Sequence, residues 1–524
     1  MPVDKQPQSP VFEQNPDTGS DAMRSPPRTL GQTLRQLGPG MIVAAAVVGS
    51  GELIATTKVG AEAGFSLLWI ILIGCTIKVF AQVEFGRYTV TWNRTGLRAL
   101  DSVPGPRWRV NWLLWYWVLV MALSLSQQGG IVGAVGQTLS ITRPLTTHGA
   151  QFNEVQDSLV RTKVQLALAE TQNVERSELD SLRADVGVLS SQLDGFKEPL
   201  DAYLWAGLIA VVTSVILYFG RYALIQAVAT GLVISFTLIT LFTLIMMQTI
   251  PEWAIHGHDL MAGLSFRLPP FVEDLSANPI ATALATFGII GIGAAELIIY
   301  PYWCLEKGYA RFTGPRDGSP QWLERARGWM RVLQIDAWTS MVVYTIATAA
   351  FFLLGAAVLS RSGLNPEKAD LIRTLAEMYA PVFGAWTPRI FLLGSFAVLY
   401  STFFVVAASY GRLITDALVL FKLIDGNEST RLKSTRLISV LWPLIAVLTY
   451  IFIRAPVAMI LASGLCQSVM LPMLGFAALY FRYKQSDPGL RPGKLWDLML
   501  WLSFTGLLII GIWALVSTIG PIIN

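Results

Sequence analysis

Two glutamates in apolar stretches of the sequence have surroundings that could support ion chemistry. Glu52 directly follows the glycine-rich residues 49–51 in the first long apolar segment, and Glu296 directly follows residues 293–295 in the sixth. A carboxylate at the centre of a membrane costs about 3 kcal/mol, so such a group normally faces a cavity, an ion or a partner. Glycine weakens a helix interior and can free backbone carbonyls. Carboxylate and carbonyl oxygens together suit a hard cation such as Mg²⁺, Mn²⁺ or Ca²⁺.

We predict one ion site built from these two segments. Glu52 and Glu296 would be the metal ligands, and backbone carbonyls beside them would add further oxygens. Interrupted helices at corresponding positions of two halves are the best sequence pointer to a transporter's binding site. The predicted contact residues are Glu52, Glu296, Gly49, Gly51, Gly293, Ala294 and Gln467. The alternative is that each glutamate is a buried, hydrogen-bonded structural group.

Lys78 and Gln127 are candidate gating residues or charge partners of this site. Lys78 lies in the middle of the second apolar segment, and Gln127 lies in the third. A lysine inside a membrane needs a partner. A permanent pair with Glu52 or Glu296 would put its ammonium group in the place of an ion. Lys78 could instead pair with Glu84 or extend toward the membrane surface, and Gln127 could line a path or hydrogen-bond between helices.

The elements that must position these residues are membrane-spanning helices. Apolar residues make up 53% of the chain and charged residues only 14%, against about 25% charged in soluble domains. A span needs about 20 apolar residues, and we count eleven such segments. They lie near residues 41–61, 65–92, 110–139, 203–219, 223–250, 279–304, 333–359, 386–408, 437–453, 456–480 and 498–519. The fold class is therefore an all-α polytopic membrane protein.

Charge and motif content exclude several other classes of protein. The net charge of +4 follows from basic loops, so nothing indicates nucleic-acid binding. The three cysteines lie in or beside apolar segments, which argues against a disulfide framework. All three histidines, His148, His256 and His258, lie between the apolar segments. No nucleophile with a base, metal cluster or phosphate loop is visible, so we expect neither an enzyme nor a bound cofactor.

Basic residues predict the orientation. Lysine and arginine are concentrated after the second, sixth, eighth and tenth segments, and such loops face the cytoplasm. This places the N-terminus in the cytoplasm and, with eleven spans, the C-terminus outside. We expect an integral protein of the bacterial inner membrane.

The chain divides into four parts. Residues 1–37 contain a polar, proline- and serine-rich stretch, and we predict a disordered cytoplasmic tail there. Residues 38–139 carry the first three spans, and residues 202–524 carry the other eight. The intervening residues 140–201 are a polar insertion outside the membrane.

The insertion has the pattern of two amphipathic helices. Apolar residues recur at helical spacing in each half, but the two stripes differ in phase by one residue, so one continuous coiled-coil seam is not expected. Because the two flanking spans must lie close together, we predict an antiparallel helical hairpin on the outer face. It could be a rigid decoration, or residues 150–198 could mediate self-association or bind a partner.

Several stretches of the chain resemble the Nramp family of divalent metal transporters. Residues 38–44 are similar to the family's entry into its first span, and residues 60–69 follow its pattern into the second, on to Gln82 and Arg87. The sixth span is also in register through Tyr302. The resemblance implies a LeuT-type fold, in which spans 1–5 and 6–10 form inverted repeats and an eleventh span is added.

The family's metal-site signature is replaced at three places. Residues 49–52 stand where the family has Asp-Pro-Gly-Asn, and residues 297–299 stand where it has methionine followed by Pro-His. Acidic residues that the family associates with proton movement correspond to Gln127 and Gly130. These departures imply a two-carboxylate site for a hard ion, as in the Nramp-related magnesium transporters.

Our leading functional hypothesis is a secondary carrier that moves Mg²⁺ or Mn²⁺ by alternating access without obligatory proton coupling. A second hypothesis is a symporter of a small cationic organic solute on the same fold. A third is a membrane scaffold or sensor that does not transport, because Lys78 closes the site. Beyond the metal ion, the predicted partners are the lipid bilayer and whatever the hairpin binds.

Overall fold

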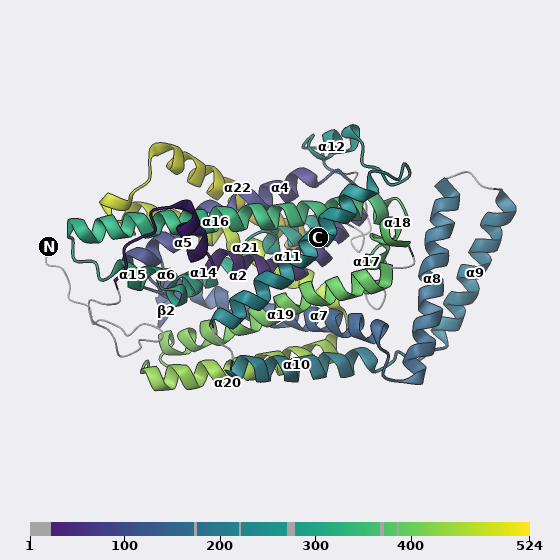
Figure 1. The fold of residues 1–524 in the computed structure, drawn as a ribbon, viewed down its shortest axis with the longest axis horizontal. Helices are drawn as coiled ribbons and strands as arrows, with labels where there is room; N and C mark the ends of the chain where they lie inside the picture. Colours follow the sequence, from purple (N-terminus) through teal and green to yellow (C-terminus); the bar gives the residue numbers. More distant parts are fainter. Residues whose placement is uncertain are drawn as a thin grey trace.

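The computed structural model describes residues 23–171, 175–219, 222–269, 278–366, 371–384 and 387–523. Among these residues, eleven helices are long and apolar enough to cross a membrane, which confirms the predicted span count. They lie side by side as a bundle (Figure 1). The only strands of the described residues are β1 (Arg107–Trp108) and β2 (Val110–Asn111), a short antiparallel pair.

The eleven spans are formed by the following elements: α2 (Pro39–Val47), π-helical η2 (Val48–Thr56) and α3 (Thr57–Ala63) in span 1; α4 (Leu68–Thr76) and α5 (Lys78–Trp92) in span 2; α7 (Trp112–Thr142); α10 (Asp201–Phe219); α11 (Tyr222–Met247); α13 (Pro279–Ile289) and α14 (Ala294–Lys307) in span 6; α16 (Pro320–Leu354) and π-helical η4 (Gly355–Ser360) in span 7; α19 (Thr387–Leu420); α20 (Glu428–Ile453); α21 (Pro456–Tyr480) and π-helical η7 (Phe481–Gln485) in span 10; and α22 (Lys494–Ile523).

The other helices lie at the two ends of the bundle or outside it. They are α1 (Leu30–Gln36), α6 (Gly96–Asp101), α8 (Thr147–Thr171), α9 (Arg176–Asp194), α12 (Gly257–Gly263), α15 (Tyr309–Thr313), α17 (Leu371–Glu377), α18 (Ala380–Phe383) and the 3₁₀ turn η8 (Pro488–Leu490). Helices α8, α9, α12 and α17 lie at one end, which we call the hairpin face (Figure 1, right). Helices α6 and α15 lie at the opposite end.

Spans 1 and 6 form the core of the bundle. In both, 94% of the most apolar window is buried, against 33% or less in spans 4, 5, 9 and 11. Irregular backbone at membrane depth is tolerated only where protein or a water-filled cavity surrounds it. The central position of these two spans therefore allows each to carry a local irregularity.

Span 6 is broken between α13 and α14. Helix α13 starts at Pro279, where the Asn278 side chain accepts hydrogen bonds from the N–H groups of Ile280 and Ala281. It ends at Ile289, and Gly291 has a φ of +61°, a conformation that favours glycine. The chain re-enters a helix at Ala294.

Span 1 winds continuously through its glycines, in contrast to the predicted interruption. Residues Val48–Thr56 form a wide π-helical stretch with helical residues on both sides. The glycines here allow close approach of neighbouring elements. A Cβ on Gly51 would lie only 2.9 Å from the Ile289 carbonyl oxygen, and a Cβ on Gly49 would collide with Thr402.

The N-terminal segment differs in part from the predicted disordered tail. Residues 1–22 lie outside the described part of the chain, but residues 30–36 form α1, which the Thr29 side chain caps. The Arg24 N–H donates to the Phe312 carbonyl (3.1 Å), and the Trp329 indole donates to the Arg24 carbonyl (3.0 Å). These backbone contacts hold the segment against α15 and α16.

The insertion between spans 3 and 4 consists of α8 and α9, which pack against each other and project from the bundle (Figure 1). Its base is fixed by the Asp201 carboxylate, which accepts hydrogen bonds from the Leu145 N–H (2.5 Å), the Thr146 N–H (2.9 Å) and the Thr146 hydroxyl (2.7 Å). Helix α9 buries none of its described residues.

Candidate functional site

Glu52 connects the π-helical part of span 1 to the break in span 6. Its side chain is completely buried. Oε1 accepts a hydrogen bond from the Gly291 N–H (3.1 Å) and another from the Thr348 hydroxyl of α16 (2.9 Å). The Gly291 N–H lies in the break, outside both helices of span 6, and holds one oxygen of this carboxylate in place.

The second oxygen of Glu52 is available to a ligand. Among the residues that the structure describes, none donates a hydrogen bond to Oε2, although this atom is buried. A buried polar atom without a partner is costly. A cation or a proton at Oε2 would remove that cost.

Lys78 hydrogen-bonds to backbone carbonyls at the end of α13. Its Nζ donates to the carbonyls of Phe287 (2.5 Å) and Ile290 (2.8 Å). The side chain is completely buried. The last carbonyls of a helix lack partners within it and carry partial negative charge, so they attract the ammonium group.

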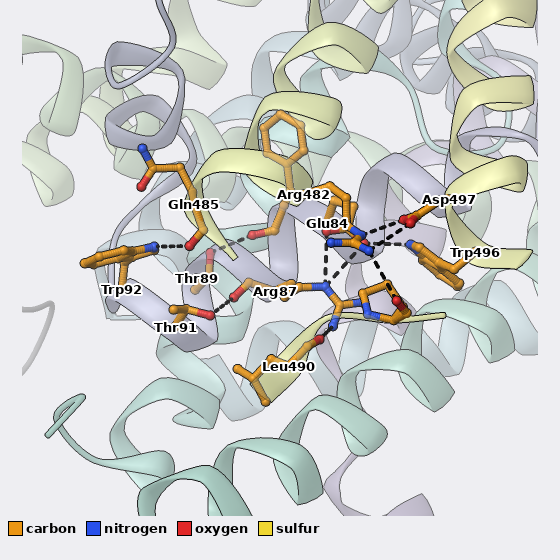
Figure 2. A network of polar contacts seen from close by, with 12 residues as sticks. Glu84, Arg87, Thr89, Thr91, Trp92, Arg482, Gln485, Leu490, Trp496 and Asp497 are labelled. Atoms are coloured by element: carbon orange, nitrogen blue, oxygen red, sulfur yellow. Dashed lines mark hydrogen bonds and ion pairs between the residues drawn. The ribbon is translucent and has the colours of Figure 1, made fainter. Parts of the chain in front are cut away.

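This arrangement differs from the ion pairs that the sequence suggested. No ion pair of Lys78 is present within the described ranges, although the ammonium attracts both Glu52 and Glu296 electrostatically. The alternative pairing with Glu84 is wrong, and so is extension to the membrane surface, because the side chain is fully buried. Glu84 forms an ion pair with Arg87 (3.1 Å) and accepts a hydrogen bond from the Trp496 indole (2.7 Å) (Figure 2).

Gln127 and Gln467 belong to one hydrogen-bond network that joins spans 1, 3, 10 and 6. Gln127 Nε2 donates to the Ser50 hydroxyl (3.1 Å), and Gln127 Oε1 accepts from Ser463 (2.8 Å) and from Gln467 Nε2 (3.1 Å). Gln467 Oε1 then accepts from the Ala295 N–H (3.1 Å). Both amides thus position the residues around the break.

Glu296 lies in the first turn of α14 and is half-buried. The positive end of the helix dipole favours a carboxylate at this position. A Cβ on Gly293 would collide with Glu296 Oε2, so the glycine leaves room for this side chain. The structure places Glu52, Lys78 and Glu296 around one broken helix.

Two hydroxyl groups beside the site were not predicted from the sequence. Thr348 donates to Glu52, and Thr402 accepts from the Gly49 N–H (3.0 Å) while donating to the Ala45 carbonyl (3.1 Å). Threonine is common within apolar spans because it can bond to its own helix, so neither residue carried a distinguishing signal.

Asp336 caps span 1 at the end of the bundle opposite the hairpin. Its two oxygens accept hydrogen bonds from the N–H groups of Gly38 (2.9 Å) and Gly40 (2.6 Å). This matches the helix-capping role expected for a carboxylate at a helix N-terminus, and it ties α2 to α16.

The site offers hard ligands from few residues. In the described part of the chain, no group of three or more His, Cys, Asp or Glu residues could hold a metal ion. A cation here would rely on two carboxylates and backbone carbonyls.

In the described residues, eleven spans form a bundle in which one core span is broken and a buried carboxylate of the other contacts the break. This is the architecture of a secondary transporter. Comparison with known proteins agrees with this class. The family model described as "Natural resistance-associated macrophage protein-like", or Nramp, matches residues 185–517. The chain belongs to the Nramp family.

A curated relative and several solved structures are similar to the chain. The "Divalent metal cation transporter MntH" of Caldanaerobacter subterraneus subsp. tengcongensis is 22% identical over 365 residues, which are 69% of this chain and 67% of that protein. Two crystal structures of the Eremococcus coleocola manganese transporter, a variant and a complex with an aromatic bis-isothiourea substituted compound, each match with a TM-score of 0.57 and 14% identity. Each alignment covers 98% of this chain and 92% of the matched chain.

These matches show the LeuT-type fold predicted for the chain. The family match begins at residue 185 and so lies beyond the first three spans. The motifs with the most specific resemblance to the family lie around spans 1 and 2. The later spans therefore carry the family assignment independently of those motifs.

Proposed function

We propose that this protein carries a divalent metal cation, Mg²⁺ or Mn²⁺, across the membrane by alternating access. The observation that carries this proposal is Glu52 Oε2, a buried carboxylate oxygen without a hydrogen-bond donor among the described residues. It lies beside the broken span 6 in a protein of a family with metal-transporting members. The named activities of the relatives, divalent metal cation and manganese transport, support a divalent cargo.

The ion would bind between the two repeats. Glu52 would contribute Oε2 from span 1, and Glu296 would contribute its carboxylate from span 6. Backbone carbonyls near Gly49, Gly51, Gly293 and Ala294 would complete the oxygen ligands, a set that favours hard ions over soft ones. Gln467 would act on the ion indirectly, because its amide already holds the N-terminus of α14.

We further propose that transport needs no coupled proton. Gln127 takes the place of an acidic residue in span 3 and is engaged by Ser50, Ser463 and Gln467. An amide does not titrate, so this position cannot pass a proton. The three histidines lie outside the candidate spans.

Lys78 supports a second candidate function. Its ammonium group fills the position at Phe287 and Ile290 that a cation could occupy. If this contact never breaks, the site is closed, and the protein is a scaffold or sensor that does not transport. In a working carrier, by contrast, the nearby positive charge of Lys78 opposes binding of the transported cation.

Equilibrium binding to the purified protein tests the site directly. Isothermal titration with Mn²⁺ and Mg²⁺ should show binding to the wild type, and Glu52→Gln should weaken it at least about tenfold because one anionic ligand is lost. Glu178→Gln, which changes an exposed glutamate on α9, is the matched control and should bind as the wild type does. Equal binding by Glu52→Gln would refute the assignment of the site.

A further inference from the structure

Helix α17, which lies between spans 7 and 8, is in contact with the hairpin through Arg373. This arginine is only 8% exposed. Its Nε donates to Asp157 Oδ1 (2.6 Å), and its Nη2 donates to Asn153 Oδ1 (2.5 Å). Asn153 and Asp157 are four residues apart on α8 and so share one helix face. One guanidinium group therefore engages two successive turns of the hairpin.

Two further groups of opposite charge, Glu377 and Arg161, lie one turn further along α17 and α8. Glu377 follows Arg373 by four residues, and Arg161 follows Asp157 by four. Burial raises the pKa of Glu377, the positive charge of Arg161 lowers it, and the negative charge of Asp157 raises it. Asp157 and Arg161 on α8 thus face Arg373 and Glu377 on α17 with complementary charges.

The α8 side of this contact is held firmly. Phe152 and Leu159 are buried, and the Asn153 side chain donates to the Ser140 carbonyl at the end of span 3 (2.9 Å). The Asp201 carboxylate fixes the start of the helix. Helix α9 packs on α8 without burying any of its described residues. Helix α8 is therefore the hairpin helix that contacts the bundle.

The opposite side of α17 faces the bundle that holds the proposed ion site, which we call the transport core. Leu371, Ile372 and Leu375 are fully buried, and α17 packs against η4 and α19. Element η4 in turn packs against α3, the part of span 1 that follows Glu52. A Cβ on Gly355 of η4 would lie 2.5 Å from the Thr57 carbonyl oxygen, so the two backbones are in close contact.

We propose that the α8–α9 hairpin is a brace that holds α17 closed over the hairpin face of the transport core. Opening of the path on this face then requires the contacts of Arg373 with Asn153 and Asp157 to break. The hairpin thereby sets how often the site opens on that side. The gating role rests on the proposed transport function, but the brace itself is tested without measuring transport.

Hydrogen–deuterium exchange of the full chain measures the brace directly. In the double variant Asn153→Ala/Asp157→Ala, amides of residues 371–377 should exchange about tenfold faster, because α17 loses charged hydrogen bonds that resist local opening. Both substitutions lie on the hairpin, so the sequence of α17 is unaltered. Asn153→Ala also removes the hydrogen bond to the Ser140 carbonyl, so Asp157→Ala alone, which keeps that bond, should change the exchange in the same direction. The matched control is Arg183→Ala, which removes the pair between Arg183 and Glu170 (2.8 Å) within the hairpin, and should leave these amides unchanged.

Cys75 provides a second readout near the ion site. It is fully buried, and its backbone carbonyl accepts from the Tyr344 hydroxyl (3.3 Å). In a background with Cys304→Ser and Cys466→Ser, a water-soluble maleimide should label Cys75 faster in the double variant than in the parent. Unchanged α17 exchange, or an equal rise in Arg183→Ala, would overturn the brace. Faster α17 exchange without faster Cys75 labelling would overturn its gating role.

Discussion

Glu52 and Lys78 carry opposite charges and hydrogen-bond to different backbone groups of the broken span 6. Glu52 accepts from the N–H of Gly291, whereas Lys78 donates to the carbonyls of Phe287 and Ile290. The break in span 6 thus supplies hydrogen-bond partners to both charged side chains, which form no direct ion pair in the described structure. One carboxylate oxygen is left over, and this asymmetry is the basis of the proposed ion site.

Replacing Lys78 by methionine should strengthen ion binding. The variant keeps most of the side-chain volume but frees the two carbonyls and removes a nearby positive charge. We expect the dissociation constant for Mn²⁺ to fall by at least about tenfold, measured by isothermal titration. Lys484→Met, at an exposed position, serves as the control. Weaker binding in Lys78→Met would mean that the lysine supports the site.

The buried pair of Glu84 and Arg87 should contribute to stability. Glu84 is fully buried, Arg87 is 2% exposed, and Arg87 also donates to the Leu490 carbonyl (2.6 Å). This network joins span 2 to the segment between spans 10 and 11 (Figure 2). Breaking a buried pair from one side costs about 3 to 5 kcal/mol.

Glu84→Gln should therefore lower the apparent melting temperature in detergent, and Glu178→Gln should not. The thermal unfolding of both variants, followed by circular dichroism, makes the comparison. A Glu84→Gln protein as stable as the wild type would show that the Trp496 and Leu490 contacts suffice without the charge pair.

The types of the site residues could be predicted from the sequence, but their partners could not. Two glutamates inside apolar segments are rare enough to identify without a structure. The partner of Lys78 lies more than 200 positions away in the chain and is a backbone carbonyl, for which the side-chain pattern carries no signal. Thr348 and Thr402 carried no distinguishing signal, because threonine is common within apolar spans.

At the scale of single elements, glycine has two different uses in spans 1 and 6. Gly291 supplies the positive φ that interrupts span 6. Gly51, in contrast, remains within a wound helix, where its missing Cβ lets span 1 approach the Ile289 carbonyl. A glycine in an apolar segment is compatible with both uses, so the predicted interruption of span 1 was wrong while that of span 6 was confirmed.

Gly51→Ala should therefore destabilise the protein through packing. The added methyl group would meet the Ile289 carbonyl oxygen at 2.9 Å, and overpacking costs about 1 to 3 kcal/mol. Gly207→Ala is the matched control, because a Cβ there meets nothing within 4 Å and alanine favours the helix. Melting curves should order the variants with Gly51→Ala below the wild type and Gly207→Ala at or above it.

At the scale of the whole molecule, the span count and fold class followed from hydropathy. Eleven apolar segments predict eleven helices because a helix is the one open structure that satisfies its own backbone in lipid. The contact between α8 and α17 was beyond prediction, since it joins polar side chains of two segments that lie more than 200 residues apart in the sequence. The assignment of the hairpin face to the outside stays a prediction from the basic loops.

Cation uptake into proteoliposomes, with internal pH recorded at the same time, tests the central claim most directly. We predict that the wild type takes up Mn²⁺ or Mg²⁺ down its gradient without acidifying the interior, and that Glu52→Gln takes up neither. Uptake that is unchanged in Glu52→Gln would contradict the site. No uptake by the folded wild type, with uptake appearing only in Lys78→Met, would contradict the carrier and show that Lys78 closes it.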